Sequence, residues 1–76
     1  TAAEEHARQA AGVALEAGDG KAEAFALTIL GHSLAAQGRA EEAAEAYRRA
    51  LELRRELVQT NMAVEPQAAI PAAPRN

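Results

Sequence analysis

A glycine between two helical patterns limits the fold of this chain more than any other feature. Residues 27–57 read LTILGHSLAAQGRAEEAAEAYRRALELRREL, and Gly38 lies just past the end of the first pattern. On both sides of it, mostly apolar residues recur at the spacing of one helix face: Leu27, Leu30, Gly31 and Leu34 before it, and Ala43, Tyr47, Ala50, Leu51 and Leu57 after it. Glycine adopts, without steric cost, the left-handed conformation that commonly ends a helix. The stretch therefore predicts two antiparallel helices joined by a tight turn.

These positions also carry a resemblance to a known family. Residues 24–57 resemble the tetratricopeptide repeat, a helix-turn-helix unit of about 34 residues with small and large apolar residues at fixed offsets. The matching residues are Leu27, Leu30, Gly31, Leu34, Gly38, Ala43, Tyr47 and Ala50. Two residues depart from the pattern: Ala40 stands where an aromatic is frequent, and Arg55 where a proline usually ends the second helix. Close packing explains the pattern, since Gly31 and Ala43 let the two backbones approach.

A second copy of part of the pattern lies upstream. Residues 3–17 align with the second repeat helix at an offset of forty positions, so that Ala10 corresponds to Ala50 and Val13 to Leu53. Gly-Asp-Gly at positions 18–20 ends that helix. The helices are expected over residues 3–17, 21–37 and 40–58. This layout predicts a half repeat over residues 1–17 and a full repeat over residues 21–58.

The C-terminal part is expected to start another repeat without completing it. Residues 59–61, Gln-Thr-Asn, break the pattern, and a short helical stub is expected over residues 62–70. Pro71 falls at the equivalent of Gly31, where it would remove a hydrogen bond and clash with the preceding turn. We therefore expect an array over residues 1–62, then an aborted repeat and a Pro/Ala-rich tail over residues 63–76. The expected class is all-α: antiparallel hairpins of about three helices plus a stub, resembling a fragment of a longer array.

Composition excludes several classes of protein. The net charge is −3 and 25% of the residues are charged, which is not the balance of a polybasic nucleic-acid binder. No apolar run is long enough to span a bilayer, and no secretory leader is present. The absence of cysteine excludes disulfides and thiolate metal sites. The sequence favours a cytoplasmic protein that binds neither membrane nor nucleic acid.

The apolar residues of the chain are mostly small, so we expect a core of little apolar volume. Hydrophobic residues make up 49% of the chain, but 22 of its residues are alanine. Burial of apolar area contributes roughly 25 cal/mol per Å², and ordering the chain costs about 1.5 kcal/mol per residue. For a chain of this size the net free energy of folding is therefore close to zero. Neighbouring repeats or a second copy of the chain are expected to supply the missing stability. Self-association by helix exchange or repeat stacking is therefore an alternative function.

Few residues are candidates for catalysis or for binding a metal or cofactor. His6 and His32 have no HExxH motif or His/Cys cluster around them, and each is more often a solvated or groove-lining residue than a ligand. If His32 lines a groove, its titration near neutrality would make binding pH-sensitive. Residues 18–21, Gly-Asp-Gly-Lys, lack the long glycine loop of a phosphate cradle. We expect no enzyme activity, metal or cofactor; a small enzyme or metal protein is the remote rival.

The resemblance implies where a partner would bind. In tetratricopeptide-repeat proteins the inner surface of the first helices holds a peptide or a partner helix. Here that surface corresponds to Phe25, Thr28, His32, Ala35 and Ala36. In a short stack Phe25 could instead pack on the preceding helix. Glutamates interleave the basic run Arg48, Arg49, Arg54 and Arg55, so this run predicts a solvated face. The sequence thus favours a non-catalytic module that binds a protein or peptide, similar to repeats in large bacterial regulatory proteins.

Overall fold

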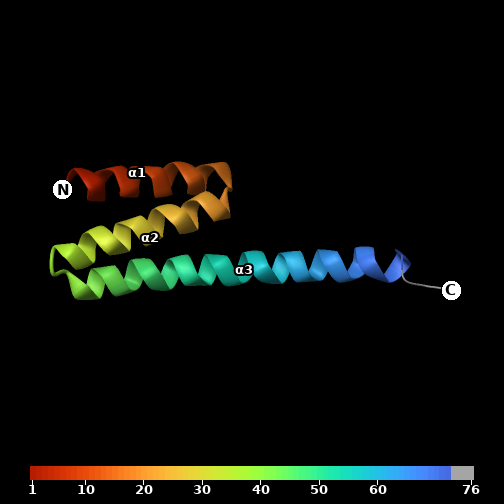
Figure 1. Cartoon of the computed structure of the whole chain (residues 1–76). Helices are drawn as coiled ribbons and strands as arrows, with labels where there is room; N and C mark the ends of the chain where they lie inside the picture. Colours follow the sequence, from red (N-terminus) through yellow and green to blue (C-terminus); the bar gives the residue numbers. More distant parts are fainter. Residues whose placement is uncertain (73–76) are drawn as a thin grey trace.

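Three α-helices form the part of the chain that the structure describes. The computed structural model describes the backbone of residues 1–72 and the side chains of residues 1–60. The helices are α1 (Ala2–Ala17), α2 (Gly20–Ala36) and α3 (Ala40–Ala72). Figure 1 shows successive helices running antiparallel, with α2 between α1 and α3. The predicted all-α class is confirmed.

Both turns form at the glycines that the sequence indicates. Gly18 and Gly38 have φ angles of 71° and 78°, in the left-handed region. Across the second turn, the Arg39 N–H donates to the carbonyl of Leu34 at 3.0 Å. This bond satisfies a carbonyl at the end of α2 that has no partner within its own helix. The turn is therefore fixed by local backbone geometry rather than by packing.

Side chains cap the starts of the first two helices. The Thr1 hydroxyl accepts a hydrogen bond from the Glu4 N–H at 3.1 Å, and the Asp19 carboxylate accepts one from the Ala22 N–H at 3.1 Å. Each cap satisfies a backbone donor in the first turn of its helix. Asp19 starts α2 at Gly20, so α2 covers Gly20–Ala36 rather than the expected 21–37.

The third helix is much longer than expected. The predicted break at residues 59–61 is wrong, because α3 continues without interruption to Ala72. Neither Gln59 nor Thr60 removes a backbone donor or requires a left-handed conformation, and the Thr60 hydroxyl donates to the carbonyl of Glu56 at 3.0 Å, as it can only within a helix. The predicted stub is therefore the second half of α3, which extends past α2 in Figure 1. The predicted tail lies, for residues 73–76, outside the described residues.

A few leucines set among alanines form the core. Leu34 is 1% exposed and is the only side chain among residues 1–60 that is fully enclosed. Leu30 is also buried, while Leu27 and Tyr47 are partly buried against the same cluster. The remaining buried apolar residues are Ala7, Ala14, Ala24, Ala26, Ala43, Ala46, Ala50 and Leu53. Alanine thus lets the three backbones pack closely, and most of the large apolar volume comes from α2.

One predicted core residue lies elsewhere. Leu51, placed on the buried face of the second repeat helix by its spacing, is 50% exposed. The buried stripe of α3 instead follows Ala46, Ala50 and Leu53, which are three and four residues apart. Leu51 lies one residue beyond this stripe and so leaves the contact with α2.

Gly31 of α2 packs directly against the ring of Tyr47 from α3. A Cβ atom built on Gly31 would lie 2.5 Å from Cε1 of Tyr47 and 2.7 Å from its Cδ1. Distances this short are not tolerated, so the ring occupies the space that any side chain at position 31 would need. The sequence analysis expected Gly31 to let the two backbones approach, whereas the space beside it is filled by the Tyr47 ring.

Alanine substitutions at two helical glycines should have opposite effects on stability. Gly31→Ala should lower the free energy of unfolding by about 1 to 2 kcal/mol, because overpacking outweighs the gain in helix propensity. Gly12, inside α1, has no atom within 4 Å of its built Cβ. Gly12→Ala should therefore raise the free energy of unfolding by about 0.5 to 1 kcal/mol. Urea denaturation followed by circular dichroism measures both, and stabilisation by Gly31→Ala would contradict the contact with Tyr47.

Candidate interaction face

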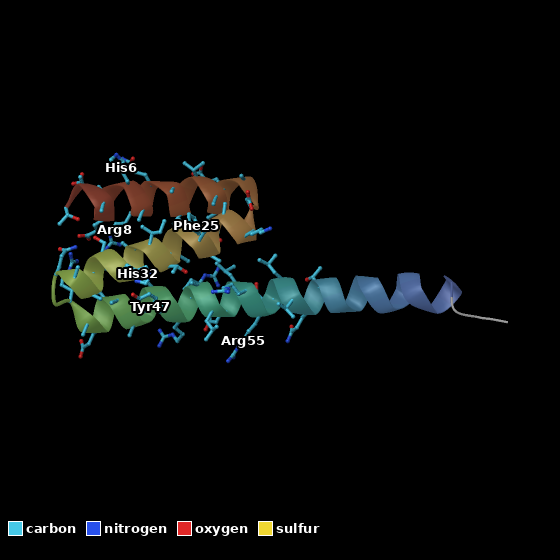
Figure 2. The ribbon with its side chains drawn as sticks, viewed as in Figure 1. His6, Arg8, Phe25, His32, Tyr47 and Arg55 are labelled. Carbon is cyan, nitrogen blue, oxygen red and sulfur yellow. The ribbon has the colours of Figure 1, made fainter. Side chains whose placement is uncertain are left out.

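The five residues predicted to bind a partner all lie on α2. Phe25 is 69% exposed, the largest exposed fraction among the large apolar side chains of residues 1–60. His32, Ala35 and Ala36 are also exposed, whereas Thr28 is half-buried. Figure 2 shows Phe25 and His32 along the same helix. Seven residues separate them, so they lie two helical turns, roughly 10 Å, apart on one side of α2.

The polar members of this face are already engaged. The Thr28 hydroxyl donates to the carbonyl of Ala24 at 2.9 Å. Nδ1 of His32 lies 2.8 Å from the hydroxyl of Tyr47, and the two rings meet edge to face with centroids 5.5 Å apart. These contacts orient His32 against α3. Phe25 is the one residue of the predicted face that offers a large, unoccupied apolar surface.

Phe25 stands between two hollows. One lies between α2 and α3, has a volume of about 280 Å³, and is lined by Lys21, Ala24, Phe25, Thr28, Arg54 and Leu57. The other lies between α1 and α2, has a volume of about 420 Å³, and is lined by Ala3, His6, Ala7, Ala10, Ala22, Phe25, Ala26 and Ile29. A partner side chain placed against Phe25 can therefore enter a groove on either flank of α2.

The sequence did not single out several residues of these hollows. Lys21 and Ile29 lie four residues before and after Phe25, so helical spacing alone could have added them to the face. Arg54 and Leu57 come from α3, 29 and 32 positions after Phe25 in the chain. No local signal marks that pairing, because it depends on how the hairpin closes.

A network of charged side chains joins α1 to the turn between α2 and α3. The Glu4 carboxylate accepts hydrogen bonds from Arg8 at 3.0 Å, from the Gln37 amide at 3.1 Å and from Arg39 at 2.8 Å. Arg39 also pairs with Glu42 at 2.6 Å. The Glu4 side chain is only 12% exposed at the centre of this network. The network ties the first helix to the turn between α2 and α3.

This environment changes the acidity of the carboxylates. The hydrogen bond from Gln37, with that from Arg8 and the charge of Arg39, lowers the pKa of Glu4 to about 2. The hydrogen bond from Arg39 likewise lowers the pKa of Glu42. In the folded chain Glu4 therefore stays charged well below the pH at which free glutamate takes up a proton, and the pKa of Glu42 is shifted in the same direction. The i,i+4 pair of Glu4 with Arg8 is readable from sequence, but the contacts with residues 37 and 39 are not.

Glu4 should make stability depend on pH below about 4.5. Because its folded pKa is about 2 against an ordinary 4.5, its contribution is complete above pH 4.5 and is lost as the pH falls toward 2. Glu4→Gln should therefore lower the melting temperature near neutral pH, and the difference from the wild type should shrink between those two pH values. Glu5→Gln is the control, since Glu5 makes no ion pair with residues 1–60. A difference that is the same at every pH would contradict this role of Glu4.

The two histidines lie on different helices, His6 on α1 and His32 on α2. His6 is exposed on α1 and far in sequence from His32, and no group of three or more His, Asp or Glu side chains that could hold a metal occurs in the described part of the chain. None of the helices described here is both long and apolar enough to cross a membrane. A comparison of the chain with models of protein families, with curated proteins and with solved structures finds no match.

Proposed function

We propose that this chain is a non-catalytic protein interaction segment of the tetratricopeptide-repeat type, which binds a protein or peptide through the outward face of α2. The observation that carries the proposal is Phe25, a large aromatic side chain left 69% exposed between two hollows. Exposed aromatic residues beside grooves are the usual anchors of protein interfaces. The resemblance of residues 24–57 to the repeat supports the same location.

A peptide-display selection tests this proposal without a known partner. Random peptides are selected on the immobilised chain, and the affinity of enriched peptides is then measured for two variants. Phe25→Ala should weaken binding by about tenfold or more, as expected for loss of an aromatic anchor. Leu15→Ala is the matched control, because Leu15 is 60% exposed on α1 and lines neither hollow. Failure to enrich any peptide, or equal losses in both variants, would overturn the proposal.

A specific observation also favours the second candidate, self-association. Ala10 and Val13 of α1 correspond to Ala50 and Leu53 of α3, forty positions later. In α3 these residues are buried under α2, Leu53 to 6% exposure, whereas Val13 is 67% exposed. The face of α1 therefore has the composition of a helix contact with no helix on it. A second copy of the chain that covered this face would bury Val13.

Substitution of Val13 separates the two candidates. Val13→Asp places a charge on the open face of α1 without touching the core. If the chain self-associates there, this variant should dissociate the oligomer, because a charge cannot be buried without a partner. If α2 is instead the binding face, Val13→Asp should leave the affinity of the selected peptides unchanged. Analytical ultracentrifugation and the binding assay read out the two effects separately.

A further inference from the structure

The hollow between α2 and α3 has a charge character unlike that of the whole chain. The chain carries a net charge of −3, yet Lys21 and Arg54 are the only charged residues that line this hollow. Phe25, Leu57 and Ala24 form its apolar wall. Its volume of about 280 Å³ is just below the roughly 300–1,000 Å³ typical of ligand cavities. It is therefore suited to a single side chain rather than to a cofactor.

Lys21 and Arg54, like Arg48 and Arg55, have no carboxylate partner among residues 1–60, whereas three other arginines do. Arg8, Arg39 and Arg49 each pair with at least one glutamate. Neither Lys21 nor Arg54 makes an ion pair or a side-chain hydrogen bond with any of residues 1–60. Two like charges beside one apolar hollow repel each other, and an anion placed between them would relieve that repulsion.

From this charge complementarity we infer that the hollow binds an acidic peptide, with one apolar side chain against Phe25 and Leu57 and a neighbouring carboxylate between Lys21 and Arg54. The inference rests on the proposed function and specifies the chemistry of the partner. The apolar contact supplies affinity, and the two cations select peptides in which glutamate or aspartate flanks the apolar residue. The chemistry required is that of short acidic segments with interspersed leucine or phenylalanine.

Two other arginines of α3, Arg48 and Arg55, offer a matched control. Figure 2 shows Arg55 pointing away from α2, on the opposite side of α3 from the hollow. Arg48 lies seven residues earlier and therefore on the same side of the helix as Arg55. Neither residue lines the hollow. A double substitution at these two positions removes the same charge as one at Lys21 and Arg54 but leaves the hollow intact.

Fluorescence anisotropy of three labelled peptides, measured with the full chain, tests the inference. The probes alternate leucine with glutamate, with glutamine or with lysine. The glutamate peptide should bind about tenfold more tightly than the glutamine peptide, as two exposed charge pairs allow, and raised salt should remove the difference. Lys21→Gln with Arg54→Gln should abolish the preference, whereas Arg48→Gln with Arg55→Gln should preserve it. Circular dichroism melts of both double variants verify that they fold.

Each contrary outcome has a distinct meaning. If the glutamate and glutamine peptides bind equally and both are weakened by Phe25→Ala, the inference is overturned while the proposed function stands. If no peptide binds, both are overturned. If the two double variants lose affinity equally, the effect is one of net charge and the hollow is not the site. Preferential binding of a labelled single-stranded oligodeoxythymidine over the glutamate peptide would overturn the inference in favour of a nucleic acid.

Discussion

Leu34→Ala is expected to lower the free energy of unfolding by about 3 kcal/mol, within the range of roughly 2 to 5 kcal/mol for leucine truncation in a core. The reason is that Leu34 is 1% exposed and fills the space where α2 meets the short side chains Ala43 and Ala46. Alanines are too short to move into the cavity that its loss would leave. In a core this thin, such a loss is a large part of the total stability.

Urea denaturation, followed by far-ultraviolet circular dichroism and extrapolated linearly, measures this effect. Leu15→Ala is the control: it is the same chemical change at a side chain that is 60% exposed, and it should cost less than about 0.5 kcal/mol. If Leu34→Ala cost no more than Leu15→Ala, Leu34 would not lie at the centre of the core and the packing described for α2 would be wrong.

The second large effect is expected at Tyr47. Tyr47→Ala should cost about 2 to 3 kcal/mol, slightly below the roughly 3 to 5 kcal/mol of a fully buried aromatic ring, because the ring is only half-buried. Its loss uncovers Gly31, which has no side chain to fill the gap, and removes the contact with His32. A cavity would then remain between α2 and α3.

Two further experiments separate the contributions that the ring and the hydroxyl of Tyr47 make to stability. Tyr47→Phe removes only the 2.8 Å contact with Nδ1 of His32 and should cost about 0.5 to 1 kcal/mol, as a part-exposed hydrogen bond does. Gly31→Ala combined with Tyr47→Ala should be less harmful than the sum of the two single changes, because the new methyl group occupies space that the ring has left. Additivity of the two changes would argue against direct contact between these residues.

Local features of the fold could be predicted from sequence. The turns at Gly18 and Gly38 depend on residues adjacent in the chain, and both form where the sequence predicts them. The sequence left open whether Phe25 faces outward or packs on the preceding helix, and its side chain is 69% exposed. Whether a partner binds there stays a prediction.

Features that depend on distant residues could not be predicted. The Glu4 network joins residues 4, 37 and 39, and the hollow between α2 and α3 brings Lys21 and Arg54 to one site. Both features form only once the helices have packed together. The length of α3 was missed for a different reason. Gln, Thr and Asn are weak helix formers rather than helix breakers, so residues 59–61 lower helix propensity slightly without ending the helix.

Sedimentation equilibrium, with circular dichroism on the same samples, tests the central claim that α2 presents a free binding face. It is measured on the unmodified chain over a roughly hundredfold range of concentration, because association makes stability depend on concentration. The proposed function predicts a helical monomer with the same helicity throughout. An oligomer that loses helicity on dilution, and that Phe25→Ala dissociates, would contradict it, because Phe25 would then be buried between copies of the chain.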